Sequence, residues 1–281
     1  MPTTLWLDTP QGHAICSQHF TPKDAPKACV IIGAAIGIPQ SYYHSFAHWL
    51  AEHGYAAVTF DYFGQGQSLT DPINKVKTSV SDWAKNDCAS VILDSKTRYP
   101  DVPLYWLGHS LGGQIAPLIE GIEAIDKLIT VACGSGYWKG NAKPTRHKAL
   151  LMWYLLMPLL TPFYGYFPGK KMGAIGDLPK NAAFEWRSWC LNPRYAAGVS
   201  HANEVRYQRF NKPMTSIAFS DDEMISLDNV KRLNSLFGQA NVQLKLIDPR
   251  GYGLKRIGHL GFFRKDYQAL WQQALLPELS L

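Results

Sequence analysis

Apolar runs alternate with helix-spaced patterns along most of this chain of 281 residues. A continuous apolar run is typical of a strand that is covered on both faces of a parallel sheet. Eight strands are predicted, of which the first two form a hairpin, at residues 5–7, 14–16, 28–32, 55–60, 102–107, 127–132, 214–219 and 242–247. Helices are predicted at residues 42–53, 81–99, 114–120, 227–237 and 262–275. This alternation indicates an α/β fold with a mostly parallel sheet and helices on both faces.

The alternation is interrupted once, between the sixth and seventh predicted strands. About eighty residues, 134–212, lie there, which is too long for a simple connection in a compact domain. We therefore expect a core of residues 1–133 and 213–281 and a separate inserted segment. The insertion includes a charge-free stretch, residues 149–168, whose three prolines argue against a straight membrane-spanning helix. A buried or interfacial helix is expected there instead.

The net charge of +6 is concentrated in the insertion. Residues 137–210 hold eleven Lys or Arg against three Asp or Glu, so this segment carries +8 and the rest of the chain −2. No nucleic-acid motif accompanies the excess, and we expect a solvated basic face without a nucleic-acid partner. An anionic substrate and a peripheral membrane contact stay open, because basic residues flank the charge-free stretch. These residues are Lys139, Lys143, Arg146, Lys148, Lys170 and Lys171.

The five cysteines are odd in number, are scattered along the chain and include no Cys-x-x-Cys pair. Neither a disulfide framework nor a zinc site is indicated, and no metal or other cofactor is expected. The first residues show no basic segment followed by an apolar core, which is the pattern of a secretory signal. We therefore expect reduced, mostly buried thiols and a cytoplasmic protein.

The strongest chemical signal is Ser110 in Gly108-His-Ser-Leu-Gly112, between a predicted strand and a predicted helix. A serine on such a tight turn needs glycine two residues before and after it, because a larger side chain would clash with the neighbouring strand and helix. The turn lifts the hydroxyl clear of the sheet. It also directs the N–H groups at the start of the helix to the place where an attacked carbonyl becomes negative. Ser110 is therefore the candidate nucleophile.

The candidate base follows from the order of residues along the chain. A serine hydroxyl needs an imidazole within hydrogen-bond reach, and a carboxylate normally orients that imidazole. In a sheet of this kind the order is serine, acid, histidine. The acid is expected after the first strand beyond the insertion, and of the nine histidines only His259, bracketed by Gly258 and Gly261, lies past that strand. His109 is adjacent to Ser110, so its ring is expected to point away.

Three carboxylates compete for the role of the acid at residues 221–223, directly after the predicted strand at 214–219. Asp222 is favoured, because the acid usually stands several residues beyond the last apolar pair of the strand. Asp221 is the second choice and Asp248 a distant third. The carboxylates without a catalytic role are expected at turns or helix starts, where they accept hydrogen bonds from free N–H groups.

A second motif, Asp61-x-x-Gly-x-Gly-x-Ser68, follows the predicted strand at 55–60. Together with the turn at Ser110 it resembles the α/β-hydrolase superfamily, in the branch near the serine aminopeptidases and the monoacylglycerol-lipase-like enzymes. The resemblance spans nearly the whole chain outside the insertion. It implies an eight-stranded, mostly parallel α/β-hydrolase sheet with helices on both faces and a helical cap, residues 134–212, between the sixth and seventh strands.

The resemblance also implies an oxyanion hole of two backbone N–H groups. One belongs to the residue after the nucleophile, Leu111, and the other to the loop after the third strand. Many relatives have His-Gly in that loop, whereas this chain has Ala34-Ala35. The second donor is then Ile36, with Ala35 as the alternative, and Gly37 gives the loop freedom to orient the N–H group.

The sequence thus predicts a metal-independent serine hydrolase that cleaves a carboxylic ester with an apolar acyl group through an acyl-enzyme. Ser110 attacks, His259 transfers the proton and Asp222 orients the imidazole. A thioesterase, a peptidase or an acyltransferase would use the same residues, and a non-catalytic ligand-binding protein is a further alternative. An aminopeptidase is disfavoured, because the basic insertion offers few carboxylates to hold an ammonium group. These are Asp177, Glu185 and Glu204.

Overall fold

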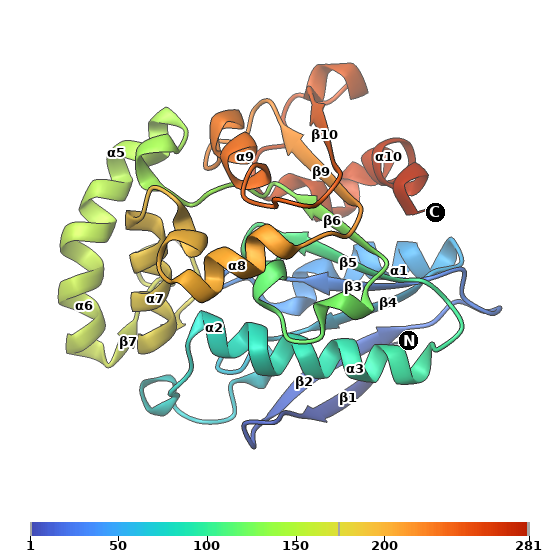
Figure 1. The fold of residues 1–281 in the computed structure, drawn as a ribbon, viewed down its shortest axis with the longest axis horizontal. Coiled ribbons are helices and arrows are strands. Elements are labelled where there is room, and N and C mark those ends of the chain that lie inside the picture. The colour runs from blue at the N-terminus through green and yellow to red at the C-terminus, as the bar shows by residue number, and fades with distance from the viewer. Residues whose placement is uncertain (1, 174, 280–281) are drawn as a thin grey trace.

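An eight-stranded sheet forms the centre of the computed structural model, which describes residues 2–173 and 175–279 (Figure 1). Its strands are β1 (Thr3–Asp8), β2 (Ala14–Phe20), β3 (Cys29–Gly33), β4 (Ala56–Phe60), β5 (Leu104–His109), β6 (Lys127–Val131), β9 (Met214–Phe219) and β10 (Val242–Ile247). They lie in the order β1-β2-β4-β3-β5-β6-β9-β10. β2 is antiparallel to β1 and β4, and all other neighbours are parallel. The predicted strands and the mostly parallel α/β sheet are confirmed.

The central strands are apolar because both of their faces are covered. Every residue of β3, β4 and β5 is buried. β10 pairs only with β9 at the edge of the sheet, and it keeps several side chains partly exposed. Uninterrupted apolar runs therefore mark the middle of the sheet, as expected for parallel strands between two layers of helices.

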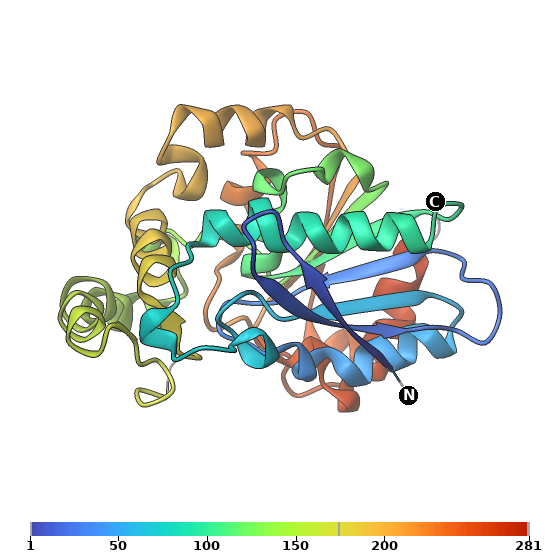
Figure 2. The ribbon, with the colours of Figure 1, turned by 90° about the horizontal axis from the view of Figure 1, so that it is seen from below.

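Helices cover both faces of the sheet. They are α1 (His44–Glu52), α2 (Val80–Asp82), α3 (Ala89–Arg98), α4 (Leu111–Gln114), α5 (Lys143–Leu151), α6 (Met157–Tyr164), α7 (Lys180–Leu191), α8 (His201–Arg209), α9 (Leu227–Asn234) and α10 (Gln268–Leu270). π-Helical segments extend α2, α5 and α10, namely Trp83–Cys88, Met152–Leu156 and Trp271–Leu275. Figure 2 shows α3 along one face and α1 along the other. Trp271 packs edge-on against Phe46 of α1, with ring centroids 5.2 Å apart, and so holds the C-terminal helix on that face.

The helix after Ser110 is shorter than predicted and begins earlier. The sequence predicts a helix at 114–120, but α4 starts at Leu111 and gives way to a 3-10 turn at Ala116–Leu118. Pro117 has no N–H group to continue an α-helix, which explains the break.

The last helix also differs from its prediction at 262–275. Two 3-10 turns, Gly261–Phe263 and Lys265–Tyr267, precede α10, so the helix begins only at Gln268. Phe262 and Phe263 are fully buried. Their apolar pattern therefore reflects a buried turn and not the face of a helix.

The segment between β6 and β9 carries α5 to α8 and a small antiparallel pair, β7 (Tyr166–Phe167) and β8 (Leu178–Pro179). A π-helical segment joins α5 and α6 into one run from Lys143 to Tyr164. Figures 1 and 2 both show α5, α6 and α7 at one end of the sheet, beyond the helices on its faces. Within residues 2–173 and 175–279, no helix is long and apolar enough to cross a membrane.

Candidate active site

Four loops meet at the edge where the parallel strands end. Ser110 directly follows β5, Ile36 follows β3, Asp222 follows β9, and His259 lies in the loop after β10. Ser110 Oγ lies 3.1 Å from Nε2 of His259, whose Nδ1 lies 2.8 Å from Oδ2 of Asp222. All three side chains are buried or nearly so. Because a carboxylate only accepts, Nδ1–H of His259 donates to Asp222, and Nε2 accepts the hydroxyl of Ser110.

The turn at Ser110 is strained and tightly packed. Ser110 has a φ of 49° and a ψ of −113°, a conformation that L-residues rarely adopt. A Cβ atom on Gly108 would lie 2.3 Å from the backbone nitrogen of Gly113, and one on Gly112 would lie 2.1 Å from the carbonyl oxygen of Gly33. Close backbone contacts therefore require both glycines, as the sequence predicts.

Asp222 is held firmly beside the imidazole. Its Oδ1 accepts the backbone N–H groups of residues 224–225, both at 2.8 Å, which leaves Oδ2 for His259. Asp248, the third choice for the acid, pairs with Arg250 at the surface, and hydrogen bonds from Arg250 lower the pKa of Asp248 to about 2. Of the three aspartates that the sequence proposes, the structure places Asp222 against the imidazole.

Asp221 and Glu223 instead bind the backbone of the loop that carries His259, called the histidine loop below. The carboxylate of Asp221 accepts the N–H groups of residues 257–258, at 2.8 and 3.1 Å. Glu223 accepts the N–H group of His259 at 3.1 Å and forms an ion pair with Arg256. Partial burial raises the pKa of Glu223, but its backbone hydrogen bonds and Arg256 outweigh this and lower the pKa on balance. The sequence predicts that the acids without a catalytic role accept N–H groups at turns or helix starts. It does not predict that Asp221 and Glu223 both bind the loop that carries His259.

A second chain of buried hydrogen bonds, not predicted from the sequence, lies behind the imidazole. Nε2 of His109 lies 3.0 Å from the carbonyl oxygen of His259, and Nδ1 lies 2.8 Å from the hydroxyl of Tyr43, which accepts the N–H group of Ala35 at 2.9 Å. Burial, together with the nearby His259, lowers the pKa of His109 to about 3, so the ring is neutral. Because a carbonyl oxygen only accepts, Nε2 carries the proton and Nδ1 accepts the Tyr43 hydroxyl. The chain connects the histidine loop with the loop after β3.

Two backbone N–H groups beside Ser110 make no hydrogen bond within the described structure. They belong to Leu111 and Ile36, the expected oxyanion donors. The alternative donor, Ala35, has its N–H group bound to Tyr43. α4 has only four residues, so it lacks the dipole of a long helix. This turn therefore offers the N–H group of Leu111 to a developing negative charge.

The loop after β3 also touches the insertion. Gly37 has a φ of 70°, which favours glycine. A Cβ atom on Gly37 would lie 2.6 Å from the backbone nitrogen of Gly176. Both the backbone conformation and the close contact with the insertion therefore restrict position 37 to glycine. They also fix the backbone conformation next to Ile36.

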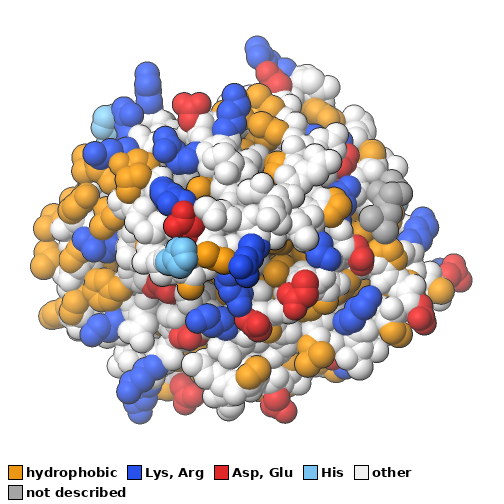
Figure 3. All heavy atoms as spheres, in the orientation of Figure 1, with side chains coloured by type: hydrophobic (Ala, Val, Ile, Leu, Met, Phe, Trp, Pro, Cys, Tyr) orange, Lys and Arg blue, Asp and Glu red, His pale blue; other side chains and the backbone are white. Residues whose placement is uncertain are grey.

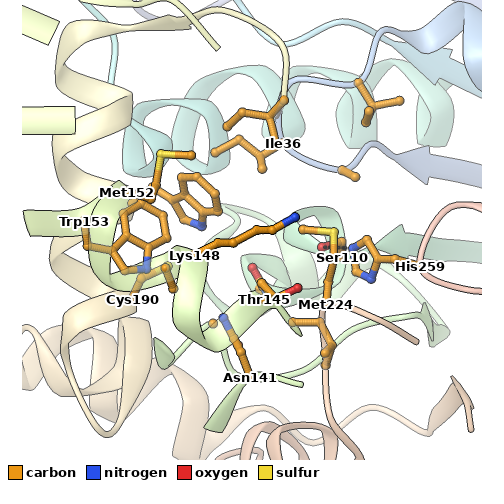
Figure 4. A pocket seen from close by; sticks show the side chains of 18 of the residues that line it. Ile36, Ser110, Asn141, Thr145, Lys148, Met152, Trp153, Cys190, Met224 and His259 are labelled. Atoms are coloured by element: carbon orange, nitrogen blue, oxygen red, sulfur yellow. Dashed lines mark hydrogen bonds between the residues drawn. The ribbon is translucent and has the colours of Figure 1, made fainter. Parts of the chain in front are cut away.

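A cavity of about 250 Å³ opens beside Ser110, between the edge of the sheet and the insertion (Figure 4). Its lining is mostly apolar and includes Trp153 and Trp186, which pack edge-on with ring centroids 4.9 Å apart. Three polar side chains from the start of the insertion also line it: Asn141, Thr145 and Lys148.

The three carboxylates of the insertion are engaged elsewhere. Glu185 accepts hydrogen bonds from the N–H group and the hydroxyl of Ser81, Asp177 accepts a nearby backbone N–H group, and Glu204 pairs with Arg194. None of these three side chains lines the cavity. As far as the chain is described, the cavity offers no carboxylate to hold an ammonium group.

Residues 24–184, more than half of the chain, match the family described as "Serine aminopeptidase, S33". Mouse monoglyceride lipase is 29% identical over 110 residues, which cover 38% of this chain and 35% of that protein. The lysophosphatidylserine lipase ABHD12 of Macaca fascicularis is 26% identical over 200 residues, which cover 68% of this chain and 40% of that protein. The matches thus span about two fifths of the length of these curated relatives.

A solved structure of a soluble variant of monoglyceride lipase from Saccharomyces cerevisiae, in complex with a substrate analog, is similar in fold. It aligns with a TM-score of 0.65 and 16% identity over 88% of this chain and 86% of that one. At this identity the likeness concerns the fold alone. The family match and the strand order lead to one conclusion: the chain belongs to the serine aminopeptidase S33 family of α/β-hydrolases, and its sequence is distantly similar to lipases.

Proposed function

We propose that this protein is a serine hydrolase that cleaves a carboxylic ester with an apolar acyl group. The proposal rests on one observation above all. The hydrogen-bonded chain from Ser110 through His259 to Asp222 opens onto an apolar cavity. Membership of a hydrolase family supports the reaction class, and the geometry supports the role of each side chain.

In the proposed mechanism, Ser110 Oγ attacks the ester carbonyl and passes its proton to Nε2 of His259. Asp222 keeps the imidazole in the accepting tautomer and stabilises the imidazolium ion. The N–H groups of Leu111 and Ile36 donate to the oxyanion of the tetrahedral intermediate. His259 then protonates the leaving alcohol oxygen as the C–O bond breaks, which leaves an acyl-enzyme. Water, deprotonated by His259, attacks the acyl group and releases the carboxylic acid.

The cavity supports an apolar acyl group and disfavours a free amino group. Met152, Trp153, Ile175 and Trp186 supply apolar surface, whereas the charged side chain that enters the cavity is a lysine, Lys148. An aminopeptidase needs a carboxylate near the scissile bond to hold the substrate ammonium, so the family description is not carried over to this chain. Thioesterase, other peptidase and acyltransferase chemistry would use the same groups and are the alternatives to be tested.

A chain-length series of p-nitrophenyl esters, with the matching thioesters, tests the proposal. We expect wild-type turnover to rise with acyl length until the cavity is full. Ser110→Ala should lower turnover by several orders of magnitude, with an unchanged circular dichroism spectrum. Full activity of Ser110→Ala would overturn the mechanism. No turnover by the wild type, together with no fluorophosphonate labelling of Ser110, would favour a non-catalytic ligand-binding protein.

We further propose that residues 134–212 form a cap on the core of residues 1–133 and 213–281, and that this cap contacts a membrane surface. Several apolar side chains of the helical run in the insertion are exposed: Leu150, Leu151, Tyr154, Leu155, Leu159 and Phe163. Lysines lie at or near both ends of the run: Lys139, Lys143, Lys170 and Lys171. Figure 3 shows hydrophobic side chains gathered among basic ones on the side where α5 and α6 lie. Exposed apolar side chains beside lysines suit the surface of a membrane with anionic lipids.

The cysteines bear on the compartment. All five are buried and free of disulfides, as the sequence predicts, and burial raises the pKa of Cys29 to about 12. Thiols of this kind are unreactive and need no oxidising environment. The cytoplasm is therefore the location we propose.

A further inference from the structure

One charged side chain enters the apolar cavity from the insertion. Lys148, on α5, lines the cavity, and Figure 4 shows it extending across the cavity with its ammonium group directed toward Ser110 and His259. The ammonium group forms no hydrogen bond or ion pair with any residue that the structure describes. The sequence places Lys148 among the basic residues that flank the charge-free stretch. In the structure its side chain stays exposed to solvent and also lines the cavity.

The helix that carries Lys148 is fixed to the core beside the site. The hydroxyl of Thr145, about one turn before Lys148, donates to the carbonyl oxygen of Glu223 at 2.6 Å. The N–H group of Ala142 donates to the carbonyl oxygen of Met224 at 3.3 Å. Both acceptors lie in the loop after β9, so the base of the Lys148 side chain keeps a defined place relative to that loop.

A second hydrogen-bond donor also lines the cavity. The side-chain oxygen of Asn141 accepts Nδ2–H of Asn229 at 3.1 Å, which leaves the amide nitrogen of Asn141 without an acceptor in the described part of the chain. The nearby carboxylate of Glu223 is turned to Arg256 and to the N–H group of His259. An ammonium group and an amide N–H group that both lack acceptors favour a ligand that supplies anionic oxygens.

We propose that Lys148 selects esters whose alcohol part carries an anionic group, a phosphate or a carboxylate, close to the scissile bond. This inference rests on the function proposed above. Met152, Trp153 and Trp186 supply the apolar wall that suits an acyl chain, whereas the ammonium group is directed toward Ser110, where the alcohol oxygen leaves. Lys148 is exposed to solvent in the free protein, so water partly screens its ion pair with the substrate, and we expect its contribution to kcat/KM to be about tenfold.

The test compares two substrates with the same decanoyl chain, monodecanoylglycerol and decanoylglycerol phosphate. The readout is the ratio of kcat/KM for the phosphate to kcat/KM for the neutral ester. Wild type should prefer the phosphate, and Lys148→Gln should lower the ratio about tenfold. Lys148→Arg keeps the charge and should keep most of the preference. Lys180→Gln, an exposed lysine of α7 that does not line the cavity, is the matched control and should leave the ratio unchanged.

Two further substrates test which anionic group Lys148 recognises and on which part of the substrate that group lies. Decanoylglycerate carries a carboxylate on the alcohol part and should depend on Lys148 in the same way as the phosphate. The p-nitrophenyl monoester of decanedioic acid carries its carboxylate at the far end of the acyl chain, and Lys148→Gln should not change its rate relative to that of p-nitrophenyl decanoate. A greater loss on this last substrate than on the phosphate would overturn the placement of the anion on the alcohol.

The outcomes distinguish this inference from the proposed function. If wild type and Lys148→Gln show the same ratio while hydrolysis of the neutral ester depends on Ser110, the role of Lys148 is wrong and the hydrolase stands. If no ester is hydrolysed in a Ser110-dependent way, the proposed function itself fails. If Lys148→Gln does not fold, the wild-type ratio decides: it should fall in about 0.5 M sodium chloride, and a ratio independent of salt overturns the inference.

Discussion

The two walls of the cavity differ in how their polar groups are held. On the core side, Ser110, His259 and Asp222 are bound to one another, and backbone hydrogen bonds fix the loops that carry them. On the insertion side, the ammonium group of Lys148 lacks a partner among the described residues, and several apolar side chains of α5 and α6 are exposed. Polar groups paired within the protein preserve one geometry, whereas unpaired groups are available to a ligand. We therefore propose that the core supplies the chemistry and that the insertion recognises the substrate.

Replacing the acid should damage the core side most. Asp222→Asn cannot hold the imidazole in the accepting tautomer, so we expect kcat to fall about 10⁴-fold with little change in stability. Asp221→Asn is the matched control, because Asp221 binds the N–H groups of the histidine loop and not the imidazole. It should lower the free energy of unfolding by about 1–2 kcal/mol and kcat by less than about tenfold. Steady-state kinetics measures kcat, and urea unfolding measures the free energy of unfolding. A larger loss of kcat for Asp221→Asn than for Asp222→Asn would identify Asp221 as the acid.

The buried His109 should make the core sensitive to acid. Its pKa in the folded protein, about 3, lies below the ordinary 6.5, so the unfolded chain binds one more proton between these values. The stability contributed by the neutral ring is complete above about pH 6.5 and is lost as the pH falls toward 3, by up to about 1.4 kcal/mol per pH unit.

His109→Gln measures this contribution, because glutamine does not titrate. The wild type should exceed the variant in free energy of unfolding at neutral pH, and this difference should shrink as the pH falls from about 6.5 toward 3. Urea unfolding at a series of pH values gives the difference directly. A difference that stays constant with pH would contradict a buried neutral ring.

Removal of the Tyr43 hydroxyl should lower kcat less than replacement of Asp222 does. Tyr43→Phe leaves the N–H group of Ala35 and Nδ1 of His109 unpaired, which loosens the loop that carries Ile36. We expect kcat to fall about tenfold and the free energy of unfolding to fall by about 1–3 kcal/mol, with KM nearly unchanged.

Tyr62→Phe is the control for this positioning role. The Tyr62 hydroxyl is equally buried and donates to the carbonyl oxygen of Ala34 in the same loop, but it does not contact His109. Its loss should cost similar stability and leave kcat within about twofold. Equal falls in kcat for Tyr43→Phe and Tyr62→Phe would show that the hydrogen bonds through His109 do not position the site and contribute only to packing.

The smallest effect is expected on the insertion side, from Phe163→Ser. Phe163 is 81% exposed on α6, so its loss should leave the fold and the turnover of a short soluble ester unchanged. Binding to vesicles of phosphatidylcholine and phosphatidylglycerol should weaken about fivefold, because one aromatic side chain no longer enters the interface. Leu93→Ser removes a 70% exposed side chain from α3 and should not affect vesicle binding. Equal losses in the two variants would argue against a membrane-facing cap.

The contrast between the two walls could be predicted only in part from the sequence. Covered strands need apolar side chains on both faces, so the sheet is visible as apolar runs, and the shared edge of parallel strands brings Ser110 and His259 together. The end of the helix after Ser110 is harder to predict, because Pro117 shortens the helix while the apolar spacing continues. Local patterns therefore predict the strands better than the ends of the helices.

Contacts between distant residues account for most of what the sequence does not reveal. Tyr43 meets His109 across 66 positions of the chain, and no local pattern encodes that pair. The alternation of side chains along β5 does signal that His109 points away from Ser110, but not what it binds. The place of the Lys148 side chain beside the cavity depends on how α5 is rotated about its axis, which a pattern of basic residues leaves undetermined.

In the proposed mechanism, Ser110 carries the acyl group during the reaction. Rapid mixing of the protein with p-nitrophenyl decanoate, followed by an acid quench within the first turnover, traps the intermediate for mass spectrometry. We predict one decanoyl group per chain, on the peptide that contains Ser110, and none on Ser110→Ala. A decanoyl group on another residue, or equal acylation of Ser110→Ala, would contradict the proposed mechanism.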